Sequence, residues 1–469
     1  MENQNAYQKP VTLKNILKFA VPTIVMTMFM SFYTMVDGLF VSNLLGTGAL
    51  SAINLTAPVI QFVTAISTML ATGGSAVIMR KMGEQKEKEA REDFTALILV
   101  NVAAGLFMWA AGSLAMSHIF AGMNLSAEVA GYCTDYLKHY LMFTVPILLM
   151  NNFTLYMIAC GKATLSLVCS VSGGLLNMAL DFCFLAVFPM GIRGAAIATG
   201  LGYSVTAVAG LAVFSRKKNL LHFEKPVFRF QVLKSAAANG CSEMATAMVT
   251  GIITLIFNWT MLKYVGEDGV AAITIIMYVL MFASSLYTGY SYGVAPMLSF
   301  YYGEKNREKL RKLMKVSLKV IGVLSLATVA LSLAVTRPLV SVFARPDNPV
   351  YELAVTGNRI CTLALLFIGF NIFASGMFTA LSNGMVSAVL AFSRSFVFML
   401  ITMLVLPALL GVNGIWLATP AAELMAFALS LFMFRKYRER YGYYGRITNE
   451  KTQKSYEFAE SELENPGGI

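Results

Sequence analysis

Long apolar runs alternate with short polar loops along almost the whole chain. An α-helix needs about 20 mostly apolar residues to cross the hydrocarbon core of a bilayer, and many of these runs reach that length. The pattern predicts twelve helices, at residues 14–42, 49–79, 92–118, 129–158, 163–188, 192–214, 231–263, 269–299, 311–335, 350–381, 386–408 and 413–435. The expected fold class is an all-α membrane protein with twelve transmembrane helices.

The loops between the predicted helices alternate in charge. Four of them are rich in Lys and Arg, at residues 80–91, 215–225, 303–315 and 435–440. Twelve passes place all four on one side of the membrane, and Lys/Arg-rich loops stay in the cytoplasm. We therefore expect a multi-pass protein of the cell (plasma or inner) membrane with both termini cytoplasmic.

The two halves of the chain are similar to each other at a constant shift. Gly46 aligns with Gly266, a shift of 266 − 46 = 220 residues. The same shift pairs Gly73, Gly83, Glu84, Arg91, Gly191 and Thr199 with Gly293, Gly303, Glu304, Arg311, Gly411 and Thr419. An even number of spans per half makes both halves enter the membrane in the same direction, so a pseudo-twofold axis along the membrane normal should relate them.

This repeat predicts two six-helix bundles that face each other across a central cleft. The N-terminal bundle should occupy residues 1–214 and the C-terminal bundle residues 231–435. The basic segment 215–230 is the predicted cytoplasmic linker, and the polar segment 436–469 is a predicted disordered cytoplasmic tail.

Composition supports a membrane protein and excludes several other classes. The chain is 57% hydrophobic and only 13% charged, with a mean hydropathy of +0.65. Its net charge of +11 is spread over loops rather than over one face, so no nucleic-acid partner is expected. The six cysteines are dispersed, and we find no phosphate-binding, dinucleotide-binding or zinc-protease motif. We predict that the protein is not an enzyme, has no cofactor and draws its energy from an ion gradient.

Four carboxylates lie within the apolar segments: Asp37, Asp181, Glu243 and Glu423. Arg394 is the clearest basic counterpart, so the predicted interior is acidic and suits cations. An ionised side chain in hydrocarbon costs at least about 2.5–3.5 kcal/mol, so each needs a partner, a proton or a water-filled cavity. Because a low dielectric disfavours the charged form, such carboxylates can exchange protons near neutral pH.

Helical spacing places these acids on polar stripes. Tyr33 and Asp37 share one helix face. Two longer stripes consist of Ser170, Gly173, Asn177 and Asp181, and of Glu243, Ala247, Thr250, Thr254 and Asn258. We interpret them as cavity walls; the alternative is that they hold helices together by interhelical hydrogen bonds. Glu423 could equally brace a kink at Pro420, and Arg394 is expected to be its structural partner.

The sequence resembles the multidrug and toxic compound extrusion (MATE) family, in particular its MepA-like bacterial members. The similar segments cover nearly the whole chain: "VDGLFVSNLLGTGALSAINLTAP" (36–58), "LNMALDFCFLAVFPMGIRGAAIAT" (176–199), "SEMATAMVTG" (242–251), "FNWTMLKYVGEDGVAAI" (257–273) and "GVNGIWLATPAAE" (411–423). The resemblance implies a V-shaped pair of bundles that exports amphipathic, mostly cationic drugs in exchange for H⁺ or Na⁺.

The resemblance also implies residue roles. It assigns cation coupling to Asp37, Asn177, Asp181 and Thr199, with Na⁺ as a candidate ion at the first three. It assigns substrate binding to Glu243, to which Tyr33 and Asn258 on the polar stripes and Asn152 are added. Asn152 departs from the family pattern, because "NNFTLYMIACGK" lacks the Arg that follows the two Asn residues in relatives.

The hypothesis is therefore a monomeric antiporter that alternates its access between the two sides of the bilayer. A flippase for lipid-linked cell-envelope precursors is the alternative, although pyrophosphate binding requires several Lys or Arg residues in the cleft. A membrane receptor or scaffold is the third class, and it has no need for acidic sites in matching bundles.

Overall fold

The computed structural model describes residues 7–119 and 126–443, with side chains except at 38–43, 46–48, 50, 51 and 117–119. Its elements are α2 (Leu13–Gly83), α3 (Glu87–Ile119), α4 (Ala127–Leu141), α5 (Thr144–Ala159), α6 (Ala163–Phe182), α7 (Ile192–Phe214), α8 (Phe230–Tyr264), α9 (Glu267–Gly303), α10 (Arg307–Ser341), α11 (Pro349–Cys361), α12 (Leu365–Ala380), α13 (Gly384–Phe392), α14 (Met399–Leu410) and α15 (Val412–Tyr441). Three short segments are the π-helices η1 (Cys183–Val187) and η3 (Ser393–Phe398) and the 3₁₀-helix η2 (Thr362–Ala364). The described residues contain no strand.

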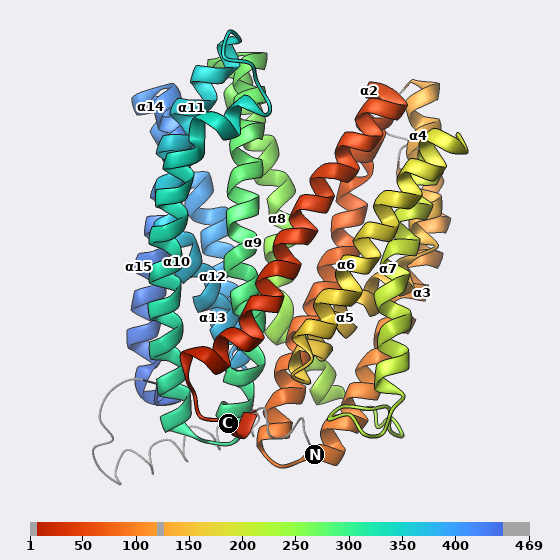
Figure 1. The fold of residues 1–469 in the computed structure, drawn as a ribbon, viewed down its shortest axis with the longest axis vertical. Coiled ribbons are helices and arrows are strands. Elements are labelled where there is room, and N and C mark those ends of the chain that lie inside the picture. The colour runs from red at the N-terminus through yellow and green to blue at the C-terminus, as the bar shows by residue number, and fades with distance from the viewer. Residues whose placement is uncertain (1–6, 120–125, 444–469) are drawn as a thin grey trace.

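The predicted all-α membrane fold is confirmed. Within the described ranges, eleven segments are long and apolar enough to span a membrane, and the bent pair α4 and α5 makes up to twelve. The chain rises and descends repeatedly between the two ends of the molecule (Figure 1). We call the lower end in that view, where the chain termini lie, the basic end, and the upper end the open end.

Several predicted boundaries are wrong in detail. The helices predicted at 14–42 and 49–79 belong to one continuous helical element, α2. The helix predicted at 129–158 breaks between α4 and α5 with a bend of 53°. Pro146 lies just after that break and has no N–H to bond to the preceding turn, which explains the bend. The helix predicted to end at 435 continues to Tyr441, and residues 444–469 of the predicted tail lie outside the described residues.

The two bundles meet at the basic end and diverge toward the open end, so the molecule has the predicted V shape (Figure 1). The apolar cores follow this division. One core at the basic end joins both bundles, for example Tyr156 of α5 with Tyr290 of α9. At the open end the cores separate, one containing Leu148 and Ala196, and the other containing Ile276 and Trp416.

The contact at the basic end has the symmetry that the repeat predicts. A Cβ atom added to Gly83 would overlap the carbonyl oxygen of Phe300, and one added to Gly303 would overlap that of Arg80. The shift of 303 − 83 = 220 residues also relates Arg80 to Phe300. Each half therefore presents the same backbone-to-backbone contact to the other, as in an isologous interface.

The segment between the bundles packs onto the N-terminal bundle. Leu221 is fully buried, and the ring of Phe223 stacks on that of Phe94 of α3 with a centroid distance of 5.5 Å. Arg229, directly before α8, makes ion pairs of 2.6 Å with both Glu92 and Asp93. The last fixed contact on the N-terminal side thus lies one residue before the first helix of the C-terminal bundle.

Candidate functional site

The N-terminal bundle contains a buried acidic pair. Asp37 lies in the first span of α2, and Asp181 lies in the last turn of α6, just before the π-helical segment η1. Asp181 is fully buried, Asp37 is half-buried, and their carboxyl groups interact electrostatically. Such a pair is unfavourable in an apolar interior unless protons or a bound cation neutralise it. Single π-helical turns occur frequently at functional sites.

Four buried oxygen atoms of this cluster have no hydrogen-bond partner among the described residues. They are Asp37 Oδ1, Asn177 Oδ1 and both carboxylate oxygens of Asp181. Asn177 lies one turn before Asp181 on α6, and its Nδ2 donates to Thr199 Oγ1 of α7 at 3.5 Å. The structure thus brings together the four residues predicted for cation coupling. Buried oxygens without a donor require an explanation, and a proton or cation supplies one.

A small cavity lies beside these oxygens. It has a volume of ≈ 10 Å³ and is lined by Tyr33, Asn177 and Tyr203, among others. The buried Tyr33 hydroxyl donates to that of Tyr203 at 3.0 Å, so these two rings connect α2 to α7. The space suits about one water molecule or a small ion next to the acidic cluster.

Glu243 lies on α8 in a second, narrow cavity between the two bundles. This cavity has a volume of ≈ 40 Å³, and Thr72 and Leu155 of the N-terminal bundle face Tyr292 and Thr379 of the C-terminal bundle across it. Glu243 is half-buried, so its carboxylate contacts the interior of the bundle contact rather than bulk water. The basic end is therefore closed over an acidic group.

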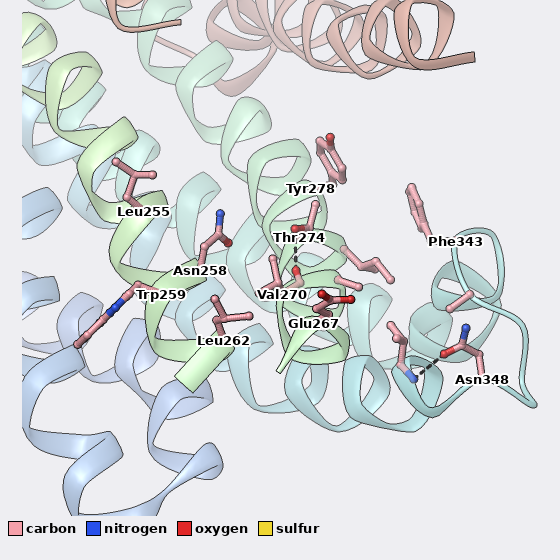
Figure 2. Close-up of a pocket in the computed structure, with 14 residues that line it drawn as sticks. Leu255, Asn258, Trp259, Leu262, Glu267, Val270, Thr274, Tyr278, Phe343 and Asn348 are labelled. Atoms are coloured by element: carbon pink, nitrogen blue, oxygen red, sulfur yellow. Dashed lines mark hydrogen bonds between the residues drawn. The ribbon is translucent and has the colours of Figure 1, made fainter. Parts of the chain in front are cut away.

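A much larger cavity lies at the open end of the C-terminal bundle (Figure 2). It has a volume of ≈ 840 Å³ and is bounded by α8, α9 and the connection between α10 and α11. Leu255, Trp259, Tyr278 and Phe343 supply apolar and aromatic wall, and the Trp259 side chain is 66% exposed. Cavities of this size and character hold drug-sized molecules.

Few polar groups enter this larger cavity. The hydroxyl of Thr274 donates to the carbonyl of Val270 (2.8 Å), and Asn348 Oδ1 accepts from the N–H of Val350 (2.9 Å), as Figure 2 shows. Asn258 Oδ1 is buried without a hydrogen-bond partner in the described part of the chain, and Glu267 is exposed in the first turn of α9. The two acceptors left for a ligand are thus an amide oxygen and a carboxylate.

The predicted polar stripe on α8 connects these two cavities. Glu243 and Asn258 are 15 residues apart, which corresponds to about 22 Å along a helix. Between them, Thr250 and Thr254 donate to the carbonyls four residues earlier, so their hydroxyl protons are used within α8. The stripe therefore provides two separate sites on one helix.

The structure does not bring Asn152 into any of these cavities. Its Nδ2 donates to Asn101 Oδ1 (2.8 Å) and to the carbonyl of Leu148 (2.9 Å), and Asn101 Nδ2 returns a bond to Asn152 Oδ1 (3.3 Å). Both amides are fully buried. This reciprocal pair holds α3 against α5.

The aromatic wall of the large cavity was not among the predicted site residues. Two of its members, Trp259 and Glu267, lie in the segment "FNWTMLKYVGEDGVAAI", which already joined aromatic and acidic residues around one turn. Phe343 gave no such signal because it reaches the cavity from a connection about 80 residues away in sequence, a distance that helical periodicity does not cover.

These features define a polytopic helical membrane protein with cavities between and within two pseudo-symmetric bundles, the architecture of a secondary transporter. The chain belongs to the MatE family, whose model matches residues 22–183 and 241–406. It is similar to the multidrug export protein MepA of Staphylococcus haemolyticus, with 22% identity over 92% of this chain and 96% of that protein. MepA of Staphylococcus aureus (strain MRSA252) is 21% identical over 91% of this chain and 95% of that protein.

Solved structures share the fold. One is described as the outward-facing conformation of a multidrug resistance MATE family transporter; it has a TM-score of 0.85 and 22% identity, and the match covers 90% of this chain and 94% of that one. A MATE structure in complex with MaL6 has a TM-score of 0.86 and 22% identity, with coverage of 90% and 95%. The predicted MATE resemblance is thereby confirmed.

Proposed function

We propose that this protein is a secondary active transporter that exports amphipathic, mostly cationic compounds in exchange for H⁺ or Na⁺. The observation that carries the proposal is the set of unpartnered oxygens around Asp37 and Asp181. Two carboxylates in a low-dielectric bundle are stable only with a bound positive charge, and they have no basic partner within the described residues. They are therefore suited to bind and release the coupling ion.

Asp37, Asn177 and Asp181 offer carboxylate and amide oxygens, the ligands that hard cations prefer, while Thr199 holds the Asn177 amide in place. The same carboxylates accept protons, so both ions fit the chemistry of the cluster. The cluster lies wholly in the N-terminal bundle. Occupation by a cation would neutralise the pair and permit closer packing of α2 against α6.

The substrate should bind in the cavity at the open end. Aromatic faces attract organic cations, and Trp259 and Tyr278 are placed to supply them beside the Glu267 carboxylate. Asn258 would orient the ligand through its unpartnered oxygen. Glu243 lies nearer the basic end and would meet the substrate when that end opens.

Alternating access follows from the V shape. A ligand drives the change between orientations only if it binds them with different affinity. Since the Lys/Arg-rich loops mark the cytoplasmic side, the basic end is cytoplasmic, and the described V opens to the outside. In this proposal residues 1–214 and 231–435 move as the two units, 215–230 links them, and 436–469 forms a cytoplasmic tail; the protein works as a monomer in the cell membrane.

Dye flux in vesicles tests the proposal. The purified protein is reconstituted with an imposed pH gradient or Na⁺ gradient, and ethidium transport is followed by fluorescence. We expect one gradient to drive transport and Asp37→Asn or Asp181→Asn to reduce it at least about tenfold, because an amide binds neither ion as a charge. Asp135→Asn is the matched control, since Asp135 pairs with Arg193 at the exposed open end.

Unimpaired flux in Asp37→Asn, at equal protein level, would refute the role of that residue. Absence of ethidium flux under both gradients would refute the proposal as a whole. A flippase for lipid-linked precursors would instead move a fluorescent pyrophosphate lipid between leaflets. The ionisable groups that line the two larger cavities, Glu243 and Glu267, are carboxylates that repel such a lipid.

A further inference from the structure

A buried polar chain in the C-terminal bundle is not used by the coupling mechanism above. Ser430 Oγ donates to Asn371 Oδ1 (3.0 Å), and Asn371 Nδ2 donates to Glu423 Oε2 (2.8 Å). Arg394 Nε donates to Glu423 Oε1 at 2.8 Å, which completes an ion pair. Glu423 is only 5% exposed and Arg394 is half-buried, so the chain fixes the guanidinium from behind.

The position of Arg394 relates this chain to the cavity between the bundles. Arg394 lies in the π-helical segment η3, which packs against both α15, where Glu423 lies, and α8, where Glu243 lies. Its guanidinium acts electrostatically on the Glu243 carboxylate. The Arg394–Glu423 pair is thus a dipole with its positive end toward the Glu243 cavity.

We propose that Arg394, held by Glu423, is a specificity-determining residue that weakens the binding of organic cations at Glu243 and limits the charge that this cavity accepts. The inference rests on the proposed function, because it concerns how strongly a cationic substrate is held. It assigns the Asn371 and Ser430 side chains as positioning residues for the pair.

The charges explain the expected effect. Glu243, Arg394 and Glu423 together carry a net charge of −1, so one singly charged guest neutralises the group. Arg keeps its charge at any physiological pH, and the repulsion it exerts on a guest cation is therefore constant. In a poorly screened site, Coulomb interactions over several ångströms amount to about 1 kcal/mol or more. A transporter needs this limit, since a substrate held too tightly is not released.

A purely structural role is the competing explanation. The ion pair joins α15 to η3 close to Pro420, and loss of one partner would leave a buried charge unpaired. The test must therefore remove both charges together and must measure a property that packing alone does not change. The charge selectivity of ligand binding is such a property.

The decisive experiment measures equilibrium binding of tetraphenylphosphonium and of neutral triphenylphosphine oxide to the purified full-length protein. The variants are Arg394→Met/Glu423→Gln, which removes the dipole, and Arg394→Lys, which retains the charge. The matched control is Arg193→Met/Asp135→Asn, because Arg193 and Asp135 form a 2.9 Å ion pair at the exposed open end.

We expect the dipole-free variant to bind the cation about three- to tenfold more tightly and the neutral compound with unchanged affinity. Arg394→Lys and the control pair should match the wild type for both. If thermal unfolding shows that Arg394→Met/Glu423→Gln is misfolded, Arg394→Gln/Glu423→Gln, whose amides can still hydrogen-bond, is measured in the same way.

Two other outcomes are informative. Cation affinity that stays within twofold of wild type, or that changes equally for both compounds, overturns the inference and leaves the ion pair with a packing role. A wild-type protein that binds no tetraphenylphosphonium while remaining folded contradicts the proposed function itself, and with it this inference. The two failures are therefore distinguishable by the wild-type result alone.

Discussion

At the scale of single residues, two buried asparagines differ in what surrounds them. Asn177 keeps an unpartnered Oδ1 beside two carboxylates, whereas both polar atoms of Asn152 are bonded to Asn101 across α3 and α5. A saturated amide in a dry contact stabilises helix packing, while an unsaturated one has capacity left for a ligand. The same residue type thus serves packing in one place and binding in the other.

This difference predicts the effect of Asn152→Leu. The change leaves the buried Asn101 amide without its partner, so the free energy of unfolding should fall by about 1–3 kcal/mol. Asn101→Leu/Asn152→Leu should recover part of that loss, because no unpaired amide remains. Thermal unfolding of the purified protein measures both, with Asn54→Leu on the exposed part of α2 as the control. Unchanged stability together with lost ethidium binding would instead support the substrate role predicted from the sequence.

The sequence located the acidic residues but did not separate these amides. Asp37 is visible because it is the only charged residue between Lys18 and Arg80. The partner of Asn152 lies 51 residues away on another helix, and helical spacing carries no information about it. The Arg394–Glu423 pair was visible as a possibility, but its link to Glu243 depends on how η3 packs.

At the scale of helices, close backbone crossings set how the bundles meet. α2 and α9 approach so closely that a Cβ on Gly303 would overlap the Arg80 carbonyl oxygen, and Gly83 repeats the contact. The repeat in the sequence predicted that these glycines are equivalent. It did not predict that they touch, because the shift of 220 residues fixes symmetry but not which end of the V is closed.

We therefore expect Gly303→Val to oppose closure of the basic end. The overlap involves backbone, which cannot move aside as a flexible side chain can, so the closed state loses several kcal/mol. Spin labels at the exposed positions Lys88→Cys and Lys312→Cys, with Cys183 and Cys241 replaced by Ser, report the distance between the bundles. The distance distribution should move to longer values. Gly251→Ala is the control, since nothing lies within 4 Å of its added Cβ; an unchanged distribution in Gly303→Val would contradict the argument.

Helix irregularities mark the limit of prediction at this scale. The bend between α4 and α5 had a signal in Pro146, but the π-helical segments η1 and η3 had none. A π-helical turn is held by packing against neighbouring helices rather than by local propensity, so a pattern of apolar residues reads straight through it. Both segments adjoin charged residues of the proposed mechanism, Asp181 and Arg394.

At the scale of the whole molecule, one residue before α2 fastens the two bundles together at the basic end. The Tyr7 hydroxyl donates to the carbonyl of Ala159 at the end of α5, and the Tyr301 hydroxyl of α9 donates to the Tyr7 carbonyl at 3.1 Å. The Tyr7 ring also stacks on Phe300 with a centroid distance of 4.9 Å. Tyr7 is only 1% exposed, so it contacts both halves from within the joint.

These contacts exist together only while the basic end is closed, so Tyr7→Ala should favour its opening. Tyr7→Phe keeps the stacked ring and loses only the bond to Ala159, and its effect should be smaller. The same pair of spin labels distinguishes three states: wild type with the shortest distances, Tyr7→Phe intermediate and Tyr7→Ala longest. Tyr264→Ala, at the opposite end of α8 and 40% exposed, is the control. If Tyr7→Ala retains the wild-type distances, the joint is held by the helix crossings alone, and the residues before α2 contribute only to the folding of that end.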